Sequence, residues 1–133
     1  MFLIDPAFIV RHDVAPSLSW VGTPDYASTC SLSWAAGADA HAPTFADDLE
    51  ACACVLLCLA RGSLPWSVDI PFFASGNAWS VDQMAQMAEA KEEALAGLWQ
   101  ELPEWFKRLV QYARALAYGQ RIDVDEVMHI LAR

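Results

Sequence analysis

The 133-residue chain contains only two lysines, Lys91 and Lys107, and no cluster of basic side chains. Eight Lys and Arg residues stand against seventeen Asp and Glu residues, which gives a formal net charge of −9 at pH 7. Proteins that bind nucleic acids or anionic membrane surfaces do so largely through Lys and Arg side chains. The sequence therefore predicts no nucleic-acid partner and no membrane partner.

Long hydrophobic runs are also missing. The longest uninterrupted apolar run covers residues 51–60, whereas a membrane-spanning helix needs ~20 apolar residues. At the N-terminus, the apolar residues 1–4 are followed at once by Asp5 and Pro6 and carry no basic flank, unlike a secretory signal peptide. The expected localisation is intracellular, in the cytoplasm or the nucleus.

The sequence lacks the cysteine and histidine spacings of metal sites. No Cys-x-x-Cys pair occurs among its four cysteines, which are Cys30, Cys52, Cys54 and Cys58. In a helix, Cys54 and Cys58 share a face while Cys52 points elsewhere, so the three thiols do not converge on one ion. The three histidines, His12, His41 and His129, stand far apart in the chain. We expect reduced cysteines buried in the core, with no metal and no cofactor.

What the chain has in excess is apolar residues. Hydrophobic residues make up 56% of it, charged residues only 19%, and the mean hydropathy is +0.24. Average soluble domains are about 45–50% apolar and about 25% charged. Two interpretations stay open: the core is unusually rich, or some apolar surface is covered by a partner. The length predicts one domain over residues 1–133.

The pattern of apolar residues predicts a mainly α fold, with helices around a central buried helix and a short β segment in front. Residues 2–5 and 8–10 are expected to form two short strands, and residues 11–45 a long loop rich in Ser, Ala, Gly and Pro. The helical core is expected over 46–133. Its central helix begins at Asp47 and Asp48, which favour a helix N-terminus, and ends at Arg61 and Gly62. Because the helix is apolar without interruption over residues 51–60, we expect it to be buried on every side.

Three further helices are expected after residue 79. Ser80 and Gln83 form a capping-box pattern that opens the first of them. Pro103 suits the first turn of the second, which we expect to end at Gly119. Asp123 caps the last one. The apolar positions expected to pack are Met84, Met87, Leu95 and Leu98 in the first of these helices, and Val127, Ile130 and Leu131 in the last.

Two short motifs, one at each end of the central apolar helix, resemble the sequence of a known protein family. Residues 47–50 read Asp-Asp-Leu-Glu and residues 61–66 read Arg-Gly-Ser-Leu-Pro-Trp. This stretch resembles the central helix of the large lobe of protein kinases of the casein-kinase-one and vaccinia-related-kinase group. Residues 2–7 look like the magnesium-site motif of kinases, residues 21–28 like the end of the activation segment, and residues 102–106, 112–116 and 123–131 like the late helices. The resemblance covers nearly the whole chain, but only the last half of a kinase.

The resemblance implies roles for four residues. Asp5 falls at the metal-ligand position, and Asp48 at the position whose carboxylate holds the backbone of the catalytic loop. Arg61 and Trp66 are implied to be structural anchors. By the same analogy, Tyr26, Ser28 and Thr29 are either substrate-groove or phosphorylation positions, or else ordinary polar loop residues.

The machinery of phosphoryl transfer is absent from the sequence. It needs a loop and a Lys over the phosphates, a catalytic Asp and a bound metal. The chain has no Gly-rich phosphate loop and no His-Arg-Asp catalytic motif, and Asp5 is followed by Pro-Ala in place of Phe-Gly. A single carboxylate is a poor site for Mg²⁺. We therefore expect a protein that is not an enzyme.

The absent half of a kinase implies an uncovered face on the central helix, where Val55, Leu56 and Leu59 are the candidates to meet a partner. The expected function is that of a non-catalytic, pseudokinase-like binding or scaffold subunit, docked on a partner protein through this face. Two alternatives are weighed against it. The chain is one piece of a split casein-kinase-one-like Ser/Thr kinase completed by another chain, or it forms a homodimer in which each copy covers the other's helix.

Overall fold

The computed structural model describes residues 23–38, 41–67 and 80–132. This part of the chain is mainly α-helical, as the sequence predicted, and contains no strand. The two strands expected at 2–5 and 8–10, and the motif around Asp5, lie outside the described residues. The elements are α1 (Thr29–Ala35), α2 (Phe45–Arg61), α3 (Val81–Leu98), the 3-10 helix η2 (Trp99–Glu101), α4 (Glu104–Ala115) and α5 (Val124–Leu131).

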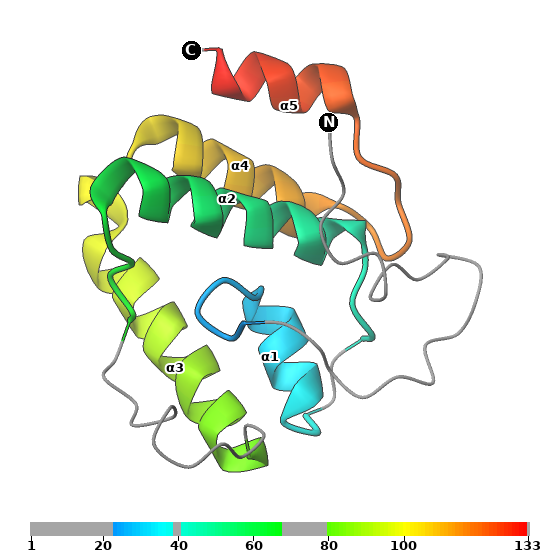
Figure 1. Ribbon diagram of the computed structural model, residues 1–133. Helices are drawn as coiled ribbons and strands as arrows, with labels where there is room; N and C mark the ends of the chain where they lie inside the picture. The colour runs from blue at the N-terminus through cyan, green and yellow to red at the C-terminus, as the bar shows by residue number, and fades with distance from the viewer. Residues whose placement is uncertain (1–22, 39–40, 68–79, 133) are drawn as a thin grey trace.

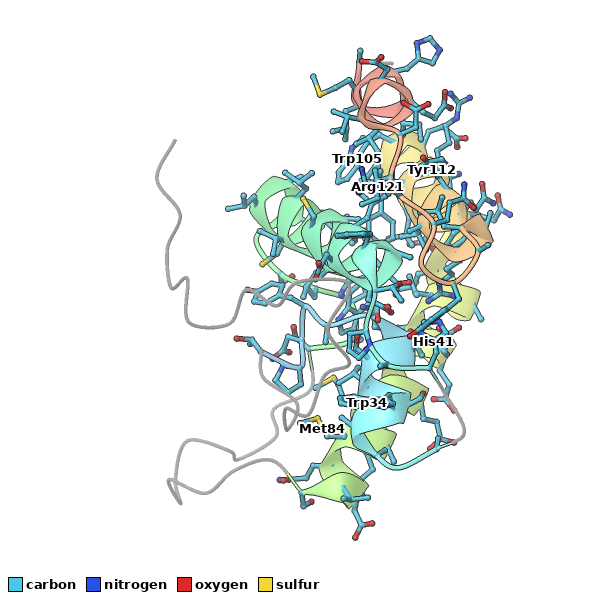
Figure 2. All side chains as sticks on the ribbon, turned by 90° about the vertical axis from the view of Figure 1, so that its right-hand side faces the viewer. Trp34, His41, Met84, Trp105, Tyr112 and Arg121 are labelled. Carbon is cyan, nitrogen blue, oxygen red and sulfur yellow. The ribbon has the colours of Figure 1, made fainter. Side chains whose placement is uncertain are left out.

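The helices lie in three tiers (Figure 1). Helices α2 and α4 run side by side in the middle tier. Helices α1 and α3 pack together below them, and α5 lies on α4 at the top, away from α1 and α3. The second view, in Figure 2, shows the same order from α5 down to α3. Helix α2 is therefore covered by α4 on one side and from below by the tier of α1 and α3.

Helix α2 ends where the sequence predicted, and it begins at Phe45, so that Asp47 and Asp48 lie in its first turn. At the N-terminus the Asp47 carboxylate accepts hydrogen bonds from the Thr44 backbone N–H at 2.7 Å and from the Thr44 hydroxyl at 3.0 Å. At the C-terminus Gly62 adopts φ 82°, and its N–H donates to the Cys58 carbonyl at 2.7 Å. A left-handed residue after the last turn is the common way for a helix to end, and glycine adopts it without a steric penalty.

Replacing Gly62 is expected to lower stability. A Cβ at φ 82° costs roughly 1–2 kcal/mol, so Gly62→Ala should reduce the melting temperature. Gly97 in the last turn of α3 is the matched control, because its φ is not left-handed and an added Cβ meets nothing within 4 Å. Gly97→Ala should instead stabilise the protein by about 0.5–1 kcal/mol. Thermal unfolding of both variants checks this; shifts of the same sign would contradict it.

The expectation that the central helix is buried on every side is wrong. Its inner side is buried, but its outer side is not: Val55 is 41% exposed, Leu59 is 78% exposed, and Cys52 is exposed as well. An apolar run in the sequence does not reveal how many neighbouring elements are available to cover it. Here the neighbours cover one side. The buried residues of α2 are Asp47, Leu49, Glu50, Ala53, Cys54 and Leu57.

The region 11–45, expected to be a loop, contains α1. Ser28 caps this helix, because its hydroxyl oxygen accepts a hydrogen bond from the Ser31 N–H at 2.9 Å. Only Ser31 and Leu32 of its seven residues are buried. So short a helix shows no apolar periodicity in the sequence, and its cap and its packing on α3 define it instead.

The late helices follow their predicted starts. Ser80 and Gln83 exchange capping hydrogen bonds of 2.9 and 3.2 Å at the start of α3. Asp123 caps α5 by accepting from the N–H groups of residues 125 and 126. Helix α4 starts directly after Pro103, as expected, but ends at Ala115, before the predicted stop at Gly119. Most of the expected apolar positions of these helices join one core with α2, centred on Leu32, Ala53, Leu57, Trp66, Met87, Leu95, Phe106, Leu109 and Val110. Leu131, which was expected to pack, is instead 40% exposed.

Candidate functional site

The outer side of α2 carries a row of exposed residues, which we call the α2 stripe: Asp48, Cys52, Val55 and Leu59. Their spacings of four, three and four residues place them on one face of the helix. Leu56, the third of the expected partner-facing residues, is partly buried beside the stripe. A large apolar side chain exposed to 78%, as Leu59 is, leaves most of its hydrophobic surface in water.

Asp48 begins the α2 stripe. Desolvation raises the pKa of its carboxyl, and the neighbouring Asp47 carboxylate raises it further. Asp48 accepts no hydrogen bond from any residue that the structure describes, in contrast to Asp47. The sequence predicted that this carboxylate holds a catalytic-loop backbone, and that role stays a prediction. The position therefore holds a partly desolvated carboxylate whose lone pairs are open to a donor.

Trp66 is a buried side chain in the segment that follows α2. It is 2% exposed, and its indole N–H donates to the Asp25 carbonyl at 2.7 Å. Its ring lies 6.5 Å from the ring of Phe106, and the Lys91 ammonium sits 4.9 Å from its centroid. Trp66 thus joins the segment before α1 to α3 and α4. Arg61, the other implied anchor, lies exposed in the last turn of α2.

A buried ionic cluster joins four helices at one point. Glu50 of α2 is 4% exposed and accepts hydrogen bonds from Arg114 of α4 at 2.9 and 3.1 Å. It also accepts from the Thr29 N–H of α1 at 3.3 Å and lies 3.5 Å from the Lys91 ammonium of α3. Arg114 reaches further to Glu92 at 2.7 Å. The Glu50 carboxylate of α2 therefore connects α2 to α1, α3 and α4.

The electrostatics of this cluster are balanced by its partners. Burial alone would raise the pKa of Glu50, but the hydrogen bonds from Arg114 and the charge of Lys91 outweigh it and lower that pKa. Burial opposes the charge of Arg114 too, yet Glu50 and Glu92 raise the Arg114 pKa. Glu50 therefore stays ionised in the fold.

Lys91 is fully buried, which the sequence did not predict. Its ammonium group donates to the Ala27 carbonyl at 2.5 Å and to the Cys54 sulfur at 3.1 Å, and it lies next to Glu50. These three neighbours match the three N–H donors of an ammonium group. The acidic side chains Glu89, Glu92 and Glu93 are exposed, but Lys91 lies on the same face of α3 as the buried residues Met87, Ala88 and Leu95.

The hydroxyl groups just before α1 and at its start make contacts with other parts of the protein. Ser28 is buried and donates to the Asp47 carboxylate at 2.5 Å. Thr29 accepts from Arg114 at 3.1 Å, and the Tyr26 hydroxyl lies 3.7 Å from the Cys58 sulfur. This contact with Cys58 is the main reason that the pKa of Tyr26 is raised. Ser28 and Thr29 are thus held by contacts within the protein, and Ser28 is inaccessible to a kinase in this conformation.

A cleft of about 280 Å³, lined by both polar and apolar side chains, lies between α1, the start of α2 and the end of α4. At its rim the Cys30 sulfur lies 3.4 Å from His41 Nε2. No sequence pattern predicted this pair, because the two residues are eleven positions apart. The expectation of four buried thiols is also wrong: only Cys54 is fully buried, Cys30 and Cys58 are partly buried, and Cys52 is exposed.

Comparisons of the chain with protein-family models, with curated proteins and with solved structures find no match. Within residues 23–38, 41–67 and 80–132, no three His, Cys, Asp or Glu side chains gather as metal ligands. In the same ranges, no helix has both the length and the hydrophobicity to cross a membrane. The described structure has two candidate binding surfaces, which are the α2 stripe and the cleft beside Cys30.

Proposed function

We propose that the chain is a kinase-like large-lobe piece that works by binding a partner protein through the α2 stripe. The observation that carries this proposal is the exposure of Val55 and Leu59 on a helix whose opposite side is fully packed. The resemblance to kinases supports it, since the helices that precede the magnesium motif of a kinase run alongside its central helix.

The spacing of the stripe suits a helical or grooved partner. Positions 52, 55 and 59 follow the i, i+3, i+7 pattern by which one helix face enters an apolar groove. Burying a Val or Leu side chain is worth about 1.5–3 kcal/mol. Two such residues, with Leu56 beside them, supply a small hydrophobic centre. Asp48 at the end of the stripe offers an acceptor to a polar or basic group of the partner.

The positions of the two lysines support a role without phosphoryl transfer. A kinase needs a lysine that is free to hold nucleotide phosphates. Lys91 is enclosed by Glu50, Cys54 and Trp66. Lys107 pairs with Glu104 at 2.8 Å on the surface of α4. Both ammonium groups are already paired with carboxylates of the protein, which favours this role.

The test is co-purification of partners with the affinity-tagged chain from its native cells. Leu59→Asp should reduce the recovered partner at least tenfold, because it places a charge in the centre of the apolar contact. The side chain is 78% exposed, so this variant should keep the helical circular dichroism and melting temperature of the wild type.

Val81→Asp is the matched control, since Val81 is 57% exposed but lies on α3, away from α2. It should leave partner recovery unchanged. Equal recovery by the wild type and by Leu59→Asp would overturn the proposal. Recovery of a chain that carries a kinase small lobe and catalytic loop, with kinase activity in the complex, would favour the split-kinase alternative instead.

A further inference from the structure

We propose that Cys30 and His41 form a base-assisted thiol site that captures a small, uncharged electrophile in the cleft between α1, α2 and α4. The site is separate from the α2 stripe and does not depend on the function proposed for it. It stands on the geometry of the thiol–imidazole pair, on the cleft beside it and on the charges that line that cleft.

The hydrogen bonds of His41 determine which ring nitrogen is basic. His41 Nδ1 lies 2.9 Å from the Ala42 carbonyl oxygen, which can only accept. Nδ1 of the neutral ring therefore carries the proton, and Nε2 keeps its lone pair. The Cys30 sulfur lies 3.4 Å from Nε2 and 3.7 Å from Nδ1, so Nε2 is the nearer of the two ring nitrogens. An edge-to-face contact with Tyr118, with ring centroids 5.1 Å apart, also packs against the imidazole. Figure 2 shows His41 on the segment that leads into α2.

The cleft gives a small molecule room beside the sulfur. Its volume is about 280 Å³, and its polar lining includes the Thr29 and Thr44 side chains. The charged groups that line it are Asp47, Glu50 and Arg114. Arg114 is already bonded to Glu50 and Glu92, and Asp47 to Ser28 and Thr44. The two carboxylates against one guanidinium leave the lining net negative, which disfavours an anionic reagent.

The same surroundings mean that the thiol needs a base. Burial raises the pKa of the Cys30 thiol, and the charges of Asp47 and Glu50 raise it further. A spontaneous thiolate is thus disfavoured. A neighbouring base overcomes this by taking the proton as the new bond forms, and general-base assistance is worth about 10²–10⁴-fold in rate.

With iodoacetamide as the probe, the step is a simple displacement. The Cys30 sulfur attacks the methylene carbon, the S–C bond forms and the C–I bond breaks with loss of iodide. The thiol proton passes to His41 Nε2, and the imidazolium then returns it to water. No oxidant or reductant is required.

The experiment measures alkylation rates of the individual cysteines of the whole chain at neutral pH by peptide mass spectrometry. Cys52 is the internal reference because it is exposed and outside the cleft, and buried Cys54 reports any unfolding. Cys30 should react at least tenfold faster than Cys52. His41→Gln should slow Cys30 about tenfold or more and leave Cys52 unchanged. The ratio of the iodoacetate rate to the iodoacetamide rate should be lower at Cys30 than at Cys52.

Three results would overturn the assignment. Cys30 reacting more slowly than Cys52 would show that burial outweighs any assistance. A faster reaction in His41→Gln would show that the imidazole only shields the sulfur. An unchanged rate in His41→Gln, with circular dichroism and Cys54 protection intact, would show that His41 is not the base.

Discussion

Glu50→Gln is expected to lower the free energy of unfolding by about 3–5 kcal/mol at pH 7. The variant leaves the fully buried Lys91 and the Arg114 guanidinium without their common carboxylate, and an uncompensated buried charge costs about that much. Typical domains are stable by only about 5–15 kcal/mol. Urea unfolding followed by circular dichroism measures the change.

Glu92→Gln is the matched control for this prediction. Its carboxylate binds the same Arg114, but its side chain is 47% exposed, so its loss should cost at most about 1 kcal/mol. Similar destabilisation by the two variants would contradict the account of Glu50 as the junction of the four helices.

The same carboxylate predicts an acid-dependent loss of stability. The pKa of Glu50 in the folded state is lowered, below the value of about 4.3 of an unfolded chain. Its contribution is therefore fully present above about pH 4.3 and is lost as the pH falls through the folded-state pKa. The stability of the wild type should fall over this acid range more steeply than that of Glu50→Gln. Parallel profiles would contradict the assignment.

Trp66→Ala is expected to cost about 3–5 kcal/mol, the usual penalty for removing a buried aromatic side chain. The residue is 2% exposed, and its loss removes the contact with Phe106 and the aromatic face beneath Lys91. Urea unfolding again measures it. A change below about 1 kcal/mol would mean that Trp66 is not an anchor of this fold.

A second variant separates packing from hydrogen bonding at this position. Trp66→Phe keeps an aromatic ring in the core but removes the N–H that donates to the Asp25 carbonyl. Trp66→Phe should lower the free energy of unfolding by about 1–3 kcal/mol, because it leaves the carbonyl unsatisfied and the ring smaller. This is less than the cost of Trp66→Ala.

Local sequence signals predicted the helix ends well. The acidic start of α2, its Arg-Gly end, the capping box at Ser80 and the cap at Asp123 all form as expected. Each depends on contacts within a few residues, which a sequence displays directly. The end of α4 was placed too late, because its turn after Ala115 depends on the path of the chain and not on a glycine at the stop.

Tertiary packing was harder to predict. An apolar run such as 51–60 indicates a buried helix, but only the arrangement of neighbours decides which side is buried. Lys91 shows the opposite case. Its spacing of four from both Met87 and Leu95 places it on the apolar face of α3, and that spacing is the signal by which its burial could have been found. Its charge suggested the solvent side instead.

The polar sites combine residues that are far apart in sequence. Glu50 and Arg114 are separated by 64 positions, and Cys30 and His41 by eleven. No spacing rule links such residues, so their pairing required the packed helices. The α2 stripe was different, because the resemblance to the central helix of a kinase lobe already pointed to Val55 and Leu59.

The most direct test of a protein-binding α2 stripe is site-specific photo-crosslinking in the native cell, with benzoylphenylalanine placed at position 59. The account predicts one discrete adduct with another protein, absent when the probe is placed at position 81 and lost when Val55→Asp is added. An adduct of twice the chain's 14.6 kDa would identify a second copy as the partner. No discrete adduct at position 59, or the same adducts from position 81, would contradict the proposal that this face binds a protein.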